Sequence, residues 1–192
     1  MLHALLADAR FWQFLHRLDE DLAATARAAR CPHCGGVLHR GDYPRKPRGV
    51  DRGLLGPAYE RRHSFCCSRD GCRRRVTPPS VRFFGRRVFL GALVVLVSAL
   101  AQGLTGKRRA GLAQQIGAGA QTLERWRRWW REALPATAFW HAVRDRWLPP
   151  VALDELPQSL LARFAAGGSM IERLAHALHF LAPLSTPGVP VR

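Results

Sequence analysis

A chain of 192 residues can hold one ordinary domain or two small ones, and its apolar content of 47% is that of a folded protein rather than a disordered one. Thirty Lys and Arg oppose fourteen Asp and Glu, and residues 31–90 with 105–132 hold fifteen of the sixteen net positive charges. Such self-repulsion does not stabilise a fold, whereas a polyanion binds through it, so we expect a nucleic acid as a partner. A basic surface that serves only solubility is the alternative.

Residues 1–30 predict an N-terminal amphipathic helix over 3–29, because Leu5, Leu15 and Leu22 recur at helical intervals among polar residues. The start of the chain has no basic segment, and Asp8 soon interrupts its apolar run. A secretory signal is therefore not expected, and the protein is expected to be cytoplasmic.

Residues 31–80 predict a zinc-ribbon-like module. The motif Cys31-Pro32-His33-Cys34-Gly35-Gly36 places two thiols on a tight turn, and a tetrahedral site needs two more ligands. We choose Cys67 and Cys72, because Phe65 then lies two residues before the ligand and Cys66 points to the other face. Cys66 in place of Cys67 stays an alternative.

The metal is expected to be structural Zn²⁺, since four filled positions leave no open site for water. Five clustered cysteines argue against a secreted disulfide framework. A set of reduced thiols that merely pack is the alternative. His33, His39 and His63 are possible substitute ligands, although solvated loop histidines are the commoner case. The basic residues of this module that are predicted to bind DNA are Arg45, Lys46, Arg48, Arg73 and Arg74.

Residues 81–134 predict a helix-turn-helix after a stiff connector at 77–80. Ala113 is small enough for two helices to cross closely, and Gly117 suits a turn that needs a positive φ. The uncharged segment 88–104 is short for a membrane span, so we expect a buried core helix and no membrane. The apolar residues expected to pack these helices together are Leu112, Ile116, Leu123 and Trp126.

The second helix of this motif is predicted to lie in the DNA major groove. Gln121, Thr122, Arg125 and Arg128 would contact bases, since Gln can pair with adenine and Arg with guanine. Lys107, Arg108 and Arg109 are better placed for phosphates. An ordinary helical hairpin with a basic solvated face is the alternative. Trp126, Trp129 and Trp130 are expected to pack rather than to stack on bases.

Residues 135–192 predict a helical C-terminal region with an irregular tail from 183. A short helix is expected near 137–147, a weak one near 157–165 and a clearer one at 169–182 capped by Ser169. The few carboxylates after residue 132 are most simply surface charges. No enzyme is expected, because a two-metal nuclease needs three carboxylates on a substantial sheet.

Taken together, CPHCGG, FCCSRDGCRRRVTPPS and LAQQIGAGAQTLERW resemble the N-terminal DNA-binding regions of bacterial insertion-sequence transposases and their accessory proteins, over roughly residues 31–131. The resemblance implies a zinc ribbon followed by a helix-turn-helix that recognises terminal repeats. It implies Cys31, Cys34, Cys67 and Cys72 as ligands, and Gln121, Thr122, Arg125 and Arg128 as base-contacting residues.

The fold we expect is mainly α with a small zinc-ribbon β module, a three-helix helix-turn-helix core and flanking terminal helices. The expected function is sequence-specific DNA binding in transposition, as an accessory protein or a transposase fragment without a catalytic domain. A homodimer or a partner transposase is a possible assembly. A transcription regulator with the same modules is the nearest alternative, and a protein that binds structured RNA is another.

Overall fold

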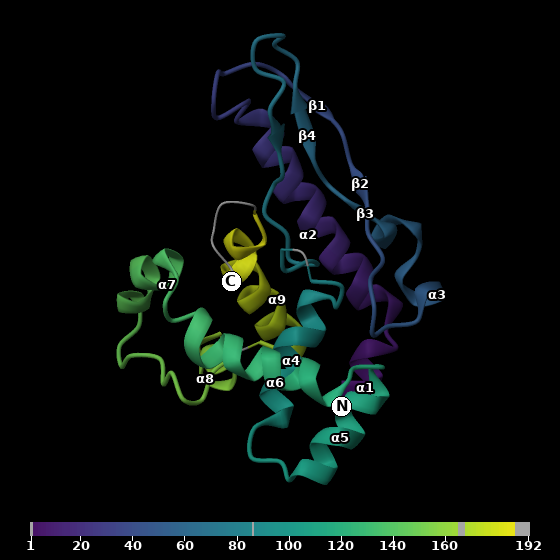
Figure 1. The fold of residues 1–192 in the computed structure, drawn as a ribbon, viewed down its shortest axis with the longest axis vertical. Helices are drawn as coiled ribbons and strands as arrows, with labels where there is room; N and C mark the ends of the chain where they lie inside the picture. The colour runs from purple at the N-terminus through teal and green to yellow at the C-terminus, as the bar shows by residue number, and fades with distance from the viewer. Residues whose placement is uncertain (1, 86, 165–167, 187–192) are drawn as a thin grey trace.

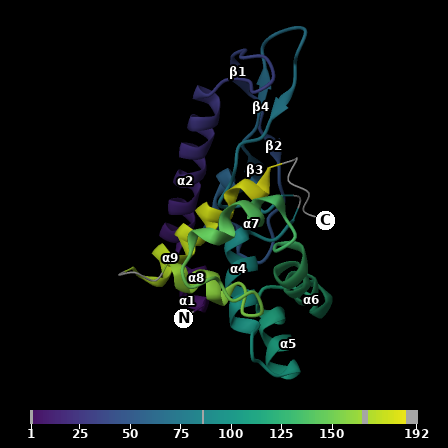
Figure 2. The same cartoon turned by 90° about the vertical axis from the view of Figure 1, so that its left-hand side faces the viewer.

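The computed structural model describes residues 2–85, 87–164 and 168–186, and over these the chain is mainly helical with a small antiparallel sheet. Helix α2 (Ala9–Ala28) is the long purple helix of Figure 1. Strands β1 (Leu38–Arg40) and β4 (Phe65–Cys67) lie at one end of the molecule, and α5 (Gly106–Gln115) lies at the other. The turned view in Figure 2 shows the same separation. The expected fold class is therefore confirmed at this coarse level.

The N-terminal segment forms two helices, so the prediction of one helix over 3–29 is wrong. Helix α1 (Leu2–Leu6) ends before Asp8, whose carboxylate accepts a hydrogen bond from the Arg10 N–H at 2.9 Å. A carboxylate in this position satisfies an amide that a new helix leaves unpaired, and so Asp8 starts α2. The apolar face of α2 buries Phe11, Trp12 and Leu15.

The segment between α2 and residue 80 forms two small antiparallel sheets. The first has the order β1-β4-β5, with β5 at Arg75–Val76, and it pairs Leu38 with Cys67. The second pairs β2 (Tyr43–Pro44) with β3 (Arg61–Arg62), and between them lie α3 (Arg52–Leu55) and the 3-10 turn η1 (Pro57–Glu60). Residues 77–80 have no regular structure, as their prolines predict.

The helical block consists of α4 (Gly91–Ala101), α5 and α6 (Ala120–Arg128), and a π-helical turn, η2 (Trp129–Ala133), extends α6. Every residue of α4 from 91 to 97 is buried, which confirms the expected apolar core helix. Across the described ranges, no helix is both long enough and apolar enough to cross a membrane.

The C-terminal region forms three short helices and two 3-10 turns: α7 (Ala138–Val143), η3 (Arg144–Arg146), α8 (Gln158–Arg163), α9 (Met170–Leu181) and η4 (Ala182–Ser185). Ser169 caps α9 as predicted, in a reciprocal pair with Glu172. The tail does not become irregular at 183, because Pro183 fits the first turn of η4 and the next residue, Leu184, is buried. Residue 165 of the predicted helix 157–165, and residues 187–192 of the predicted tail, lie outside the described residues.

Buried apolar side chains form two clusters, and α2 takes part in both. The main core draws on all four predicted segments of the chain, with members such as Phe11, Tyr59, Val94, Trp140 and Leu178. The smaller cluster, at what we call the cysteine end (residues 23–40 and 65–76), contains Ala23, Cys31, Leu38, Phe65 and Cys67.

A buried ion pair joins α2 to the segment that follows the connector. Asp19 and Arg82 are fully buried side chains, and the Asp19 carboxylate accepts from Arg82 Nε at 2.7 Å. The same carboxylate accepts from Ser80 Oγ at 2.6 Å and from the Val81 N–H at 2.7 Å. A buried charge pair is tolerated when further hydrogen bonds satisfy its atoms, and that condition is met for this carboxylate.

Candidate metal centre and nucleic-acid interface

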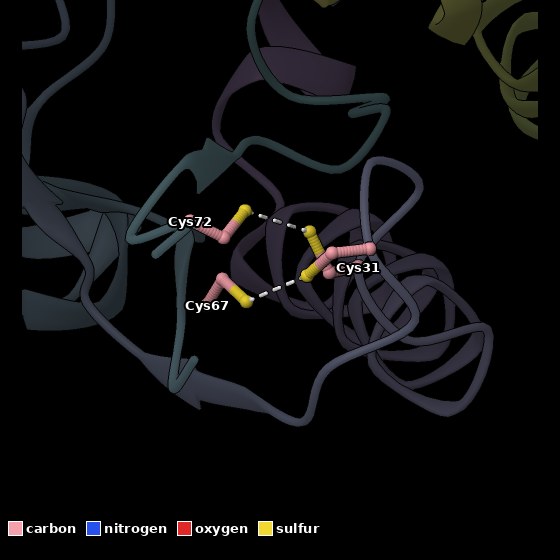
Figure 3. A group of neighbouring side chains, drawn as sticks. Cys31, Cys67 and Cys72 are labelled. Carbon is pink, nitrogen blue, oxygen red and sulfur yellow. Dashed lines mark hydrogen bonds between the residues drawn. The ribbon is translucent and has the colours of Figure 1, made fainter. Parts of the chain in front are cut away.

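Four cysteine thiols from two separate segments converge at the cysteine end. Cys31 and Cys34 belong to the turn after α2, Cys67 ends β4, and Cys72 lies in the turn before β5. Their sulfurs all lie within 4.8 Å of one another, with Cys31 Sγ 3.8 Å from Cys72 Sγ and Cys34 Sγ 3.4 Å from Cys67 Sγ. Figure 3 shows the sulfurs of Cys67 and Cys72 turned towards Cys31. These are the four cysteines that the sequence predicted.

The spacing of the sulfurs suits a tetrahedral metal ion. Metal–thiolate bonds of about 2.3 Å place the sulfurs of such a site about 3.8 Å apart. A disulfide needs about 2.05 Å, and the cysteines are free thiols. The four side chains could therefore hold a metal ion. Cys66 lies outside this group, because alternation along β4 turns it to the other face, where its sulfur is 3.2 Å from the position a Cβ at Gly41 would take.

A repeated turn explains why the second cysteine pair has an unusual spacing. In the first turn, the Cys34 and Gly35 amides donate to the Cys31 carbonyl at 3.3 and 2.8 Å. In the second, the Cys72 and Arg73 amides donate to the Arg69 carbonyl at 2.9 and 3.0 Å. Both turns end in a positive φ, 69° at Gly35 and 44° at Arg73. Arg69 thus occupies the place of Cys31, and the missing thiol comes from Cys67 on the preceding strand.

Backbone amides also set the proton affinity of the thiols. The Gly36 N–H donates to the Cys34 sulfur and, with the neighbouring thiols, lowers the pKa of Cys34 to about 7. The Arg69 N–H donates to the Cys67 sulfur and so favours the thiolate. Desolvation and the hydrogen bonds between Cys67 and the other thiols favour the protonated form more strongly, and they raise the pKa of Cys67 to about 12. A metal ion that binds here must therefore displace the proton of Cys67.

The three histidines considered as substitute ligands lie outside the thiol cluster. His33 and His39 are exposed, as expected for loop residues. His63 is buried, at 3% exposure, so a solvated loop position is wrong for it. Its Nε2 lies 3.1 Å from Arg82 Nη2, and desolvation, followed by the Arg82 charge, lowers the pKa of His63. His16, Glu20 and His63 do form a second group of possible ligands, but the Arg82 guanidinium there opposes a cation.

Helices α5 and α6 have the local geometry that the sequence predicted. Ala113 is buried where they meet, and Gly117 has a φ of 61° in the turn between them. The Ala118 N–H donates to the Ala113 carbonyl at 2.9 Å and closes that turn. Trp126 is buried against Phe89, and Trp129 and Trp130 are buried as well, so the expectation that the three tryptophans pack is confirmed.

The polar face of α6 remains open to solvent. Gln121, Arg125 and Arg128 are exposed, and Thr122 is half-buried and accepts from Arg125 Nη2 at 3.1 Å. On α5, Lys107 and Arg108 are exposed and Arg109 is half-buried.

The other predicted DNA-binding residues fall into two groups at different places. The loop holding Arg45, Lys46 and Arg48 lies against the helical block: the Arg48 N–H donates to the Val88 carbonyl at 2.9 Å. At Gly49 an added Cβ would lie 2.4 Å from Leu93 Cδ1, so only glycine permits this contact. Arg73 and Arg74 are exposed beside the cysteine cluster instead.

No protein-family model, curated protein or solved structure matches this chain. Its function must therefore be inferred from the geometry of the thiol cluster and of the α5–α6 pair.

Proposed function

We propose that this chain is a sequence-specific, double-stranded-DNA-binding protein whose helix α6 enters the major groove. The observation that supports it most is the division of α6 into two faces after the turn at Gly117. One face buries Trp126, and the other exposes Gln121, Arg125 and Arg128. A short, solvated basic helix backed by a packed core is what a recognition helix requires.

The spacing of the exposed residues suits base recognition. Gln121, Arg125 and Arg128 are separated by four and then three positions, which places them on one side of the helix. Arg can donate two hydrogen bonds to guanine, and Gln can pair with adenine. Lys107 and Arg108 on α5, together with Lys46 and Arg48 on the adjoining loop, supply charges for phosphates on either side.

The metal that fits the four thiols best is Zn²⁺, held by Cys31, Cys34, Cys67 and Cys72. Bound Zn²⁺ would supply structural cross-linking, because four protein ligands leave no position for water or substrate. The two turns that carry the thiols would then be fixed relative to each other. Arg73 and Arg74 follow directly on the second turn and would be presented to a phosphate backbone on a rigid support.

A role in transposition is proposed from the resemblance of residues 31–131 to the DNA-binding regions of insertion-sequence transposases. One helix contacts only a few base pairs, so useful specificity is expected to need a second copy or a partner transposase on an adjacent site. Recognition of inverted repeats would follow from such a pair.

The test is selection of bound duplexes from a random pool, followed by affinity measurements on the enriched site. Replacing Arg125 and Arg128 with Ala should cost about 1–3 kcal/mol for each guanine contact and broaden the selected sequence. Arg127→Ala is the matched control, since Arg127 is exposed on the same helix but lies 3.4 Å from Glu124. No enrichment over bulk DNA, or tighter binding to structured RNA in competition, would overturn the proposal.

A further inference from the structure

A cavity beside α6 contains an arginine that the sequence analysis did not single out. It has a volume of about 680 Å³ and lies between residues 87–89 and the α6–η2 helix. Arg87 and Trp129 line it from the inside, and Thr122, Arg125 and Arg128 line it from α6. Arg125 and Arg128 belong to the face that we propose for base contacts, so the cavity adjoins the proposed DNA surface.

The charge of Arg87 has no acidic partner among the described residues. Its guanidinium carbon lies 4.5 Å from the centre of the Trp129 ring, and it makes no ion pair with any carboxylate that the structure describes. Nη1 is buried without a hydrogen-bond acceptor in the same described part of the chain. Burial, followed by the charge of Arg125, lowers the pKa of Arg87 to about 10. A half-buried cation without a counter-ion has lost part of its hydration, and an anion in the cavity would offset that cost.

The cavity offers hydrogen-bond donors in excess of acceptors. Trp129 is 4% exposed, and its Nε1 has no acceptor among the described atoms. The indole and guanidinium groups can only donate, and the Thr122 hydroxyl can donate as well. Among the described residues, Glu132 is the one carboxylate that lines the cavity, against three arginines. A tetrahedral oxyanion with several acceptor oxygens matches this set of groups.

The geometry points to a phosphate-binding site formed by Arg87, Trp129 and Thr122, with Arg87 as its anchor and the two α6 arginines beside it. The shared ligand chemistry is a phosphate oxyanion, supplied by a DNA phosphodiester or by free phosphate. The assignment of the phosphate to DNA rests on the proposed function. In that case Arg87 fixes α6 against the backbone while Arg125 and Arg128 reach the bases, and its contribution does not depend on sequence.

Arg87→Gln in the full chain should weaken binding to every duplex by about tenfold or more, the loss expected for one charge-assisted contact. It should also lower the slope of log K against log salt by about 0.9, the share of one phosphate. Arg17→Gln, which removes one exposed charge on α2, is the matched control and should change neither quantity as much. Equal effects of the two variants would overturn the assignment of Arg87.

A second measurement uses the wild-type protein, so it does not depend on the folding of a variant. The Trp129 indole N–H is followed by NMR during separate titrations with inorganic phosphate, pyrophosphate and duplex DNA, with sodium chloride at matched ionic strength as the blank. A shift with DNA alone assigns the site to the DNA backbone, and a saturable shift with the small anions assigns it to free phosphate. No shift with any of the three overturns the site. If the protein fails to bind duplex DNA, the small-anion titrations still test the cavity by itself.

Discussion

The cysteine end and the main core are stabilised by different means although they share one helix. The main core buries large side chains from all parts of the described chain, including three tryptophans of the helical block. The buried apolar cluster of the cysteine end has five residues, and two of these are the thiols Cys31 and Cys67. Burial of so few side chains does not offset the entropy of ordering the loops around them. From this comparison we expect that the cysteine end, unlike the main core, depends on a metal ion that cross-links its thiols.

The largest effect is therefore expected from removal of the proposed metal ion. Chelation, or Cys67→Ser, should abolish the protection of amides in 31–40 and 65–76 while amides in α4 and α9 keep theirs, because those helices belong to the main core. Hydrogen exchange resolved by residue measures this directly. Cys66→Ser is the matched control, since Cys66 lies outside the cluster. If the two serine variants behave alike, the thiols do not hold the cysteine end together.

The second largest effect is expected at the buried ion pair of Asp19 and Arg82, which joins α2 to the segment after the connector. Asp19→Asn leaves the Arg82 charge buried without its counter-ion, and removal of one partner of such a pair costs about 3–5 kcal/mol. Denaturant unfolding monitored by tryptophan fluorescence reports on the main core. Asp21→Asn, at an exposed position on the same helix, should cost almost nothing. A loss for Asp19→Asn as small as that of the control would mean that the ion pair does not hold α2 in place.

A smaller effect is expected from added volume at the thiol cluster. A Cβ at Gly36 would lie 2.9 Å from Cys67 Sγ and 3.3 Å from Cys34 Sγ, so Gly36→Ala must push the sulfurs apart. Overpacking of this kind costs about 1–3 kcal/mol, which should appear as weaker metal binding in competition with a chelator. At Gly71 a Cβ would meet nothing within 4 Å, so Gly71→Ala is the control. Unchanged affinity in both variants would show that the sulfurs adjust freely.

The smallest expected effect is a pH dependence of stability caused by His63, whose ring lies beside Arg82. Desolvation, then Arg82, lowers the pKa of His63 below its ordinary value of 6.5, so the folded protein favours the neutral ring. The unfolded chain then binds the proton more readily, and stability present above pH 6.5 is lost as the pH falls. The charged groups facing this ring are Arg82, Glu20, Asp19, Asp42 and Arg40.

Urea unfolding at about pH 8 and about pH 5.5, on either side of the ordinary histidine pKa, should show this loss in the wild type and a smaller one in His63→Gln. His39→Gln changes an exposed ring and should retain the full loss. His16 contributes in the same direction, because desolvation lowers its pKa too, so the dependence should be reduced rather than abolished. A steeper pH dependence in His63→Gln than in the wild type would contradict the assigned direction.

Local patterns in the sequence were sufficient for several elements. The thiols of Cys31 and Cys34, the turn at Gly117 and the cap at Ser169 depend on residues within a few positions of one another, so short motifs identify them. The buried helix α4 could be predicted because its composition leaves it no solvated face. Even the choice of Cys67 followed from alternation along one short strand.

Pairs distant in sequence could not be predicted in this way. Asp19 and Arg82 meet across 63 positions, and Arg87 meets the Trp129 ring across 42. Nothing in the residues around Asp19, Arg82 or Arg87 indicates that the charged side chain is withdrawn from solvent, and charged residues are ordinarily solvated. The boundary between α1 and α2 could not be predicted for another reason. The apolar pattern continues across Asp8, although this residue is the N-cap at which α2 begins.

The sharing of α2 between the two clusters has a consequence for how the chain is made. A ribosome delivers α2 before α4 and α9, so the main core to which Phe11 and Leu15 belong is complete only after residue 180 has emerged. All residues of the cysteine end have left the ribosome once residue 76 has emerged. This region can therefore fold first and fix the C-terminal end of α2. Until α4 and α9 have emerged, this core is incomplete, and a chaperone or fast synthesis of the intervening segment would have to protect its apolar side chains.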